Sequence, residues 1–117
     1  MVPGSEINAI TFHVSDMPTS VRFYQALGFQ AAYGGETSAF TSFEHGENFV
    51  NLQLVDQPPP NGWGRVVLHV ESPDVVYQRC LDAGIKPEMA PSDAPWGERY
   101  FHVRDPDGHE LSFACKL

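Results

Sequence analysis

Two copies of one strand-and-helix pattern run through this chain, and this internal repeat limits its possible folds more than any other feature. Residues 12–15 (FHVS) align with residues 68–71 (LHVE), and in each copy a helical segment and then a glycine follow in register, at Gly28 and at Gly84. A duplicated supersecondary unit explains such a repeat. We therefore expect two similar modules in tandem.

The first copy begins with a strand and continues into a helix. Residues 7–14 alternate between apolar and polar side chains, which predicts a half-buried strand. Ser15 or Asp16 can cap the helix that follows, Pro18 suits its first turn, and Gly28 suits the position just after its end. Three more short strands are predicted, at residues 29–33, 39–43 and 49–55.

The second copy repeats this order after a proline-rich, helix-breaking connector at residues 58–62. Residues 65–70 predict a strand, Ser72 and Pro73 begin a helix, and Gly84 ends it. Three further strands are predicted, at residues 85–89, 100–103 and 110–113. Each copy therefore has the element order β-α-β-β-β.

The last two predicted strands should form a hairpin. The turn between them is Asp-Pro-Asp-Gly at residues 105–108, in which Pro106 presets φ and Gly108 can supply a positive φ. After the turn the side chains alternate, so that Leu111 and Phe113 are expected in the core while Glu110 and Ser112 lie on the opposite face.

This closing run resembles the last hairpin of the vicinal oxygen chelate superfamily, which includes glyoxalase I, extradiol dioxygenases, fosfomycin-resistance enzymes and bleomycin-resistance binding proteins. It joins Trp-Gly-x-Arg at residues 96–99, an aromatic strand, the Asp-Pro-Asp-Gly turn and a short apolar strand. Together with the repeat, the resemblance covers residues 7–113. It implies an α+β fold in which two tandem βαβββ modules, about residues 7–56 and 64–115, form a cupped, incomplete mixed β-barrel with one helix packed outside each module. The whole chain, residues 1–117, is then a single domain.

Charge and composition exclude several functions. Fifteen acidic and seven basic side chains leave a net charge of −8, which opposes binding to the phosphates of nucleic acid. No apolar run approaches the roughly 20 residues that span a bilayer, and the N-terminus lacks the pattern of a signal peptide. We expect a soluble, cytoplasmic protein with no nucleic acid or membrane partner. Cys80 and Cys115 form no CxxC motif and are expected to be reduced, buried thiols.

The resemblance also allows a test for a metal site. In metal-dependent members, a His on the first strand and a Glu on the last strand of each module hold a divalent ion. The matching residues here are Ala9 and Asn51 in module one, with Gln53 as a less direct match, and Arg65 and Ser112 in module two. None of these suits a divalent ion, because Arg65 adds a permanent cation and Ala9 has no donor atom. We expect no cofactor.

A displaced metal site is the alternative. His13 and His69 are related by the repeat and lie four residues beyond the expected ligand positions, so with Glu110 they could hold one Zn, Ni, Fe or Mn ion. The competing interpretation is a pair of hydrogen-bonded histidines. The displaced site, or His69 and Glu110 acting as an acid–base pair, would make the protein a lyase, an isomerase or a dioxygenase of glyoxalase type.

The other three histidines are weaker candidates. His45 and His109 lie in or beside predicted turns, where exposure to solvent is expected, and His102 is one side chain on a strand. No function is predicted for them.

The polar faces of the strands are expected to line a concave cleft that recognises a polar small molecule. The predicted ligand-binding residues on these faces are Thr11, His13, Asn51, Gln53, Arg65, His69, Glu110 and Ser112. Arg65 could hold a ligand carboxylate or could pair internally with Glu110.

Trp63 and Trp96 each begin a Trp-Gly step before a strand, and two roles are open to them. They could cap the core at the sheet ends, or they could form an aromatic wall for a flat ligand. Tyr33, Phe40 and Tyr100 could extend such a wall, and Trp96 is included among the predicted ligand-binding residues.

The resemblance is strongest to the bleomycin-resistance proteins, which are small, acidic, metal-free members that sequester a cationic, aromatic antibiotic in grooves at a dimer interface. It implies that this chain is a homodimer that binds a small organic molecule, cationic or aromatic, without transforming it. The N-terminal arm before residue 7 could cross to the partner chain. A third possibility is an interaction module whose cleft is vestigial.

Overall fold

The computed structural model describes residues 3–4, 7–57 and 65–117. The chain divides into two compact units, Met1–Gln25 with Phe29–Pro59 and Ala26–Gly28 with Pro60–Leu117. The predicted connector at residues 58–62, Trp63, and residues 1–2 and 5–6 of the N-terminal arm lie outside the described residues.

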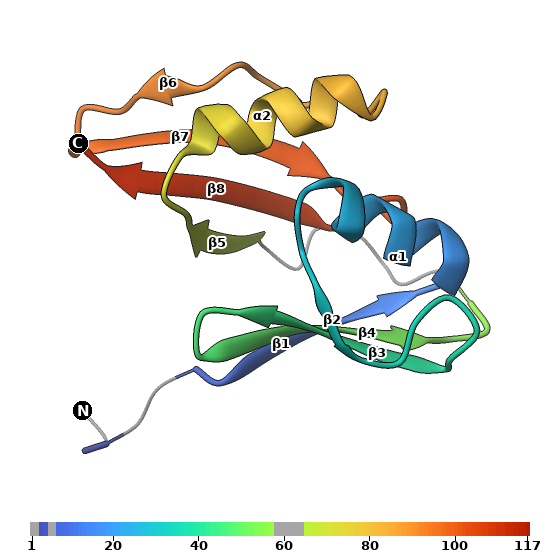
Figure 1. The fold of residues 1–117 in the computed structure, drawn as a ribbon. Coiled ribbons are helices and arrows are strands. Elements are labelled where there is room, and N and C mark those ends of the chain that lie inside the picture. Colours follow the sequence, from blue (N-terminus) through green and yellow to red (C-terminus); the bar gives the residue numbers. More distant parts are fainter. Residues whose placement is uncertain (1–2, 5–6, 58–64) are drawn as a thin grey trace. The chain divides into compact units, whose positions relative to one another are not determined.

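The first unit contains a four-stranded mixed sheet, which we call sheet A (Figure 1). Its elements are β1 (Ala9–Val14), α1 (Met17–Ala26), β2 (Ala31–Tyr33), β3 (Phe40–His45) and β4 (Asn48–Leu54). The strand order is β1-β4-β3-β2, with β1 parallel to β4 and the other pairs antiparallel. This is one βαβββ module, as the sequence predicts.

Helix α1 packs on sheet A through Tyr24, which is fully buried. The Tyr24 ring lies 6.3 Å from the ring of Phe12 on β1 and 5.6 Å from that of Phe43 on β3, so the helix covers the apolar face of the sheet. Asp16 caps the helix, because its Oδ1 accepts a hydrogen bond from the backbone N–H of Thr19 at 3.1 Å. The apolar face is therefore closed, and the opposite face carries the polar residues.

The second unit contains sheet B, which has the equivalent topology (Figure 1). Its elements are β5 (Arg65–His69), α2 (Pro73–Asp82), β6 (Ser92–Asp93), β7 (Glu98–Arg104) and β8 (Glu110–Lys116). The strand order is β5-β8-β7-β6, and β5 runs parallel to β8. Two helices and two four-stranded mixed sheets confirm the α+β class and the tandem βαβββ modules. The cupped closure of the two modules involves both units and stays a prediction.

One predicted strand is wrong. Residues 85–89 form no strand, and the second strand of the module is instead β6, which pairs with β7 through Ser92 and Asp93. Within residues 85–89, the backbone N–H of Glu88 donates to the carbonyl of His102 at 3.0 Å. Pro87 has no N–H and a fixed φ, which prevents a regular ladder in this segment.

The core of the second unit confirms the predicted faces of the hairpin. Leu111 and Phe113 are buried, and the Phe113 ring stacks on Phe101 of β7 at 5.5 Å. Tyr77 of α2 meets the same Phe101 ring edge-on at 5.6 Å, so α2 covers this face. On the helix side, Arg99 binds Asp74 at the start of α2 through two hydrogen bonds of 2.8 and 3.0 Å.

The hairpin turn is held by Asp105, whose Oδ1 accepts hydrogen bonds from the backbone N–H groups of Asp107 at 3.0 Å and His109 at 2.8 Å. Gly108 adopts a φ of +88°, as the turn requires. His109 is buried, so the expected exposure of this residue is wrong: Asp105 draws its backbone into the turn. His45 is only half-buried.

The two cysteines are both free thiols, as predicted, but they differ in burial. Cys80, on α2, is fully buried, whereas Cys115 is partly exposed near the end of β8. The expectation of two buried thiols therefore holds for Cys80 alone. Neither helix in the described part of the chain is long and apolar enough to cross a membrane.

Candidate functional site

The face of sheet B opposite α2, which we call the helix-free face of sheet B, carries polar and aromatic side chains from three neighbouring strands. Alternation along the strands and their register place its residues in rows. The rows are Arg65, Glu110 and Arg104; Val67, Ser112 and His102; and His69, Ala114 and Tyr100, with Glu98 and Lys116 beyond them. Four of the sequence-predicted site residues, Arg65, His69, Glu110 and Ser112, are thus brought to one surface.

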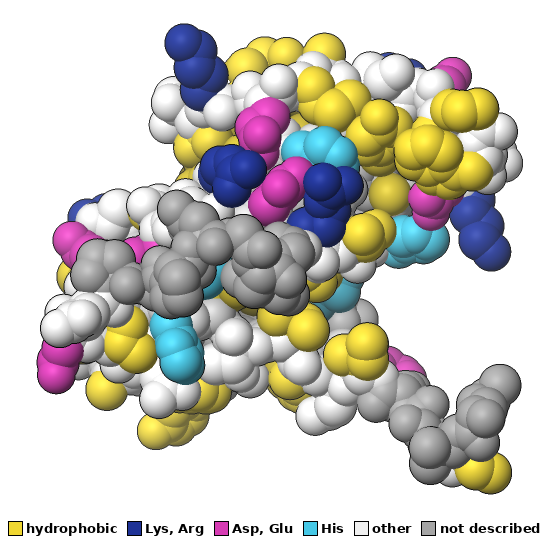
Figure 2. Space-filling model, turned by 180° about the vertical axis from the view of Figure 1, so that it is seen from behind, with side chains coloured by type: hydrophobic (Ala, Val, Ile, Leu, Met, Phe, Trp, Pro, Cys, Tyr) yellow, Lys and Arg dark blue, Asp and Glu magenta, His cyan; other side chains and the backbone are white. Residues whose placement is uncertain are grey.

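The first row is an ion-pair network centred on Glu110. Its Oε1 lies 3.2 Å from Nη2 of Arg65 and its Oε2 lies 3.5 Å from Nη2 of Arg104, while Arg104 Nε lies 3.3 Å from Glu88 Oε1. The Glu110 side chain is only 15% exposed, which strengthens its attraction to the two arginines. Figure 2 shows basic, acidic and histidine side chains gathered together on the face that it presents. Arg65 was expected to hold a ligand carboxylate or to pair with Glu110, and in the structure it pairs with Glu110.

A row of aromatic rings continues along β7. The Trp96 ring lies 5.7 Å from that of Tyr100, and the Tyr100 ring lies 5.1 Å from that of His102. Trp96 is 66% exposed and does not cap the core, because it lies in the turn between β6 and β7, where Gly97 N–H donates to the carbonyl of Ala94 at 3.1 Å. The exposed position excludes the role of core cap for Trp96, and its role in an aromatic wall stays a prediction. We call Trp96, Tyr100 and His102 the ring row.

A carboxylate lies beside this ring row. Trp96 Nε1–H donates to Oε1 of Glu98 at 2.9 Å, and Oε2 of Glu98 lies 2.8 Å from Nε2 of His69. The indole and the imidazole therefore hold the Glu98 carboxylate from two sides. This arrangement places a negative charge at the edge of the exposed Trp96 ring.

His102 occupies the middle of the face, between Tyr100 and the ion pairs of Arg104 and Glu110. Its Nδ1 is buried and has no hydrogen-bond partner among the described residues. Burial lowers the pKa of the His102 imidazole, and the positive charge of Arg65 lowers this pKa further, whereas Glu110 and Glu88 act in the opposite direction. The imidazole is therefore neutral at pH 7.

Ser112, the central residue of β8 on this face, is only 4% exposed. It pairs with Val67 on one side and with His102 on the other, so its register is the predicted one. Its neighbours leave the hydroxyl little room to reach a ligand.

Sequence reasoning missed His102, Glu98 and Arg104 as members of this surface. A signal was present, because all three share the even-numbered positions of Tyr100 on β7. Their importance depends on which residues of β5 and β8 lie beside them, and the sequence of β7 alone does not contain that information.

The other predicted ligand-binding residues lie on sheet A, on the face opposite α1. Asn51 of β4 pairs with Thr11 of β1, and Asn51 Nδ2 donates to Thr11 Oγ1 at 3.3 Å. His13 and Gln53 form the next pair on that face, and both are exposed. These four residues belong to the first unit, so their convergence with sheet B on one cleft stays a prediction.

Comparison with known proteins identifies the family. The sequence pattern of the Glyoxalase/Bleomycin resistance protein/Dioxygenase superfamily matches residues 6–113. The chain belongs to this superfamily. The resemblance carried by the closing hairpin and the repeat is thereby confirmed. No protein with a curated description matches the chain.

Several solved structures share the fold of this chain. A bleomycin resistance determinant encoded on the transposon Tn5 is 19% identical, with a TM-score of 0.79 over 96% of this chain and 98% of that one. TioX from Micromonospora sp. ML1 is 22% identical, with a TM-score of 0.75 over 97% and 100%. A glyoxalase/bleomycin resistance protein/dioxygenase from Nocardioides is 24% identical, with a TM-score of 0.72 over 100% and 87%. At these identities the likeness establishes a shared fold.

The residues of this superfamily member that stand at the expected metal positions do not fit a divalent ion. Ala9 offers no donor, Asn51 and Ser112 offer neutral oxygens, and Arg65 presents a guanidinium that is already paired with Glu110. Within neither unit do the described residues bring together three His, Cys, Asp or Glu side chains that could hold a metal ion.

The residues of the displaced metal site and of the His69–Glu110 acid–base pair have other partners in the structure. His69 contacts Glu98 rather than Glu110, and Glu110 contacts the two arginines. His13, the third member of the displaced metal site, belongs to the other unit.

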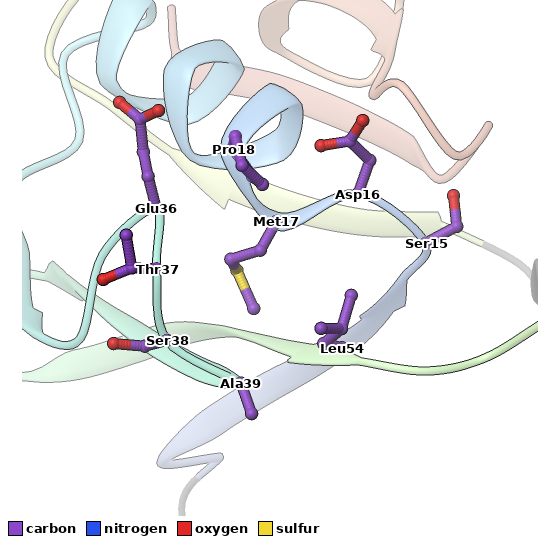
Figure 3. A pocket seen from close by; sticks show the side chains of 9 residues that line it. All are labelled: Ser15, Asp16, Met17, Pro18, Glu36, Thr37, Ser38, Ala39 and Leu54. Carbon is purple, nitrogen blue, oxygen red and sulfur yellow. The ribbon is translucent and has the colours of Figure 1, made fainter.

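A separate pocket of about 410 Å³ lies in the first unit, at the start of α1 (Figure 3). It is lined by Ser15, Asp16, Met17, Pro18, Glu36, Thr37, Ser38, Ala39 and Leu54. Its two carboxylates are already engaged, because Asp16 caps α1 and Glu36 pairs with Arg22 at 2.7 Å. The charged groups of the pocket are therefore already paired within the protein.

Proposed function

We propose that this superfamily member binds a planar, cationic small molecule on the helix-free face of sheet B and releases it unchanged. The observation that carries the proposal is the exposed Trp96 ring, which continues through Tyr100 and is bordered by the Glu98 carboxylate. Rings of this kind stack on flat ligands, and a neighbouring carboxylate favours those that are cationic.

The charge of the whole chain supports a cationic ligand. A net charge of −8 raises the local concentration of cations near the protein and disfavours anionic molecules. On the face itself the arginines are already paired with Glu110 and Glu88, so Glu98 is the charge closest to the exposed rings. The bleomycin resistance determinant with the same fold makes bleomycin a reasonable first probe.

We further propose that binding uses no metal or other cofactor. The arginine at one expected ligand position repels a divalent ion, and the remaining positions supply no anionic ligand. Analysis of protein purified without added metal should find no stoichiometric Zn, Ni, Fe or Mn. About one ion per chain, lost in His69→Ala or His13→Ala but kept in the control His45→Ala, would instead support the displaced site and a lyase, isomerase or dioxygenase activity.

A homodimer is part of the same proposal. In sheets A and B the strands β1 and β5 each end the strand order, and each pairs on one side only among the described residues. Unpaired edges are commonly covered by a second chain, and closed two-fold dimers are the most frequent assembly. Sedimentation at micromolar concentration should give twice the mass of the 13.0 kDa chain. A monomer under these conditions would refute the dimer.

Ligand binding can be tested by titrating bleomycin and 9-aminoacridine, a planar cation, into the protein. We expect Trp96→Ala to weaken binding of at least one of these probes about 10-fold, which corresponds to the roughly 1.4 kcal/mol expected for one aromatic contact. The control is Leu81→Ala, which removes an exposed apolar side chain from α2, on the other side of sheet B. Equal weakening by both substitutions would show that exposed apolar side chains act without a defined site.

The absence of a reaction is tested on the same samples. Each probe recovered after prolonged incubation with the protein should have its original mass and absorption spectrum. Conversion of a probe by the wild type, lost in His69→Ala, would favour the enzymatic alternative. Failure of every probe to bind would overturn the proposed function.

A further inference from the structure

His102 carries a buried polar atom that nothing in its own unit satisfies. Its Nδ1 has no hydrogen-bond partner among the described residues, although a buried polar group without a partner destabilises the folded state. Such atoms are rare in folded proteins and are commonly satisfied by water or a ligand. The sequence assigns His102 no function, and the position of this residue beside exposed rings makes a ligand the natural partner.

The surroundings of His102 define the group that could pair with it. The Tyr100 ring lies 5.1 Å from the imidazole, and Ser112 is the directly paired residue on β8. The charge of Arg65 reaches the imidazole from β5, and the charges of Glu110 and Glu88 reach it as well. A ligand group at this position therefore contacts the neutral His102 imidazole beside the Tyr100 ring, near an Arg65 guanidinium that is already paired with Glu110.

We infer that His102 hydrogen-bonds an uncharged amide group attached to the planar ligand, and that this contact selects among ligands that stack on Trp96 and Tyr100. The inference rests on the proposed function and names the ligand class more closely: a planar aromatic cation that bears a carboxamide. His102 thus determines specificity, while the Trp96 and Tyr100 rings and Glu98 supply the general affinity.

An amide fits this position better than a charged group. A carboxylate would compete with Glu110 for Arg65, and an ammonium would lie near both Arg65 and Arg104. An amide carries both a donor and an acceptor, so it can pair with Nδ1 in either tautomer of the neutral imidazole. Its carbonyl also lies favourably in the field of the Arg65 guanidinium.

Three related probes separate these possibilities. They are 9-aminoacridine, its 4-carboxamide and its 4-carboxylate, which share the planar cationic ring and differ in one substituent. The wild type should bind the carboxamide about 3- to 10-fold more tightly than the parent ring, as expected for one hydrogen bond. It should show no such gain for the carboxylate.

Two substitutions assign the gain to His102. His102→Phe keeps a flat ring but removes both nitrogens, so it should lose the preference for the carboxamide over the parent ring. His102→Gln, which keeps hydrogen-bonding groups, should recover part of the preference. The control is His45→Phe, a second partly buried imidazole that lies on β3 of the other unit and stacks on Phe29 at 5.9 Å. The control should keep the full preference.

The outcomes distinguish this inference from the proposed function. If the wild type binds all three probes equally, or if His102→Phe and His102→Gln keep the preference, the role of His102 is wrong while binding of planar cations stands. If the wild type binds none of the three, this inference fails, and if bleomycin does not bind either, the proposed function fails with it. Circular dichroism of each variant confirms that it is folded.

Discussion

Arg65 on β5 and Glu110 on β8 occupy directly paired positions of sheet B, and Arg65 Nη2 lies 3.2 Å from Glu110 Oε1. Glu110 also contacts Arg104 at 3.5 Å, so its carboxylate bridges two guanidinium groups. In metal-dependent relatives the position of Arg65 is expected to supply a metal ligand. Here the same position carries a cation whose charge is neutralised by its own neighbour.

The Arg65–Glu110 pair should make the wild type a poor receptor for simple anions. Glu110→Gln removes the competing carboxylate, so we expect it to bind benzoate about 3- to 10-fold more tightly, as measured by calorimetry. The gain should disappear in the double variant Arg65→Ala with Glu110→Gln.

The control for this experiment is Glu88→Gln, which removes an equal charge from the network but leaves the Arg65–Glu110 pair in place. An equal gain in Glu88→Gln would show that net charge, and not the release of Arg65, controls anion affinity. Tight benzoate binding by the wild type, lost in Arg65→Ala, would show that the pair opens readily.

Phe113 and Ser112 are adjacent on β8, but they should differ strongly in their contribution to stability. Phe113 is buried and stacks on Phe101, so Phe113→Ala should lower the free energy of unfolding by about 3–5 kcal/mol. Ser112→Ala, on the opposite face, should cost no more than about 1.5 kcal/mol. Urea denaturation measures both values. A larger cost for Ser112→Ala than for Phe113→Ala would contradict the register of β8.

His102 should make stability depend on pH below neutrality. Burial and the charge of Arg65 lower its pKa below the ordinary 6.5, while Glu110 and Glu88 partly offset this change. The unfolded chain therefore binds the proton more readily, and stability should be lost as the pH falls from 6.5 through the folded-state pKa. His102→Gln should reduce this loss between pH 7.5 and 5.5 in urea denaturation.

Burial also lowers the pKa of His45, so the control His45→Gln should remove a separate part of the same loss. The two reductions should add, because the residues lie in different units. An unchanged pH dependence in His102→Gln would mean that the imidazole is hydrated in solution.

Cys80 should be protected from alkylation until the protein unfolds. Burial raises the pKa of this thiol to about 11, so at pH 8 it is protonated as well as enclosed. Iodoacetamide should add at most one group to the folded protein, at the partly exposed Cys115, and two groups in urea. Mass spectrometry of Cys115→Ser should show no native adduct. Rapid labelling of Cys80 in that variant would reveal local opening of α2.

Much of the fold could be predicted from the sequence because its signals are local. Alternation identifies β1, β5 and the closing hairpin, and helical spacing ended by Gly28 and Gly84 identifies α1 and α2. The strand predicted at residues 85–89 was wrong for a local reason. Pro87 prevents a regular ladder there, although the apolar residues of this segment favoured a strand. The repeat then predicts two modules with the same element order, and this prediction does not depend on the contacts within them.

The sequence by itself determined which residues share a face of each strand, and therefore that Arg65, Glu110 and Ser112 lie opposite the core. Alternation of side chains follows from the backbone of one strand and needs no neighbour. Only the tertiary structure decided which of these side chains meet, because strands distant in sequence must first be set in register. That register pairs Glu110 with Arg65, brings His69 to Glu98, leaves Trp96 exposed beside Tyr100, and leaves Nδ1 of His102 without a partner among the residues that the structure describes.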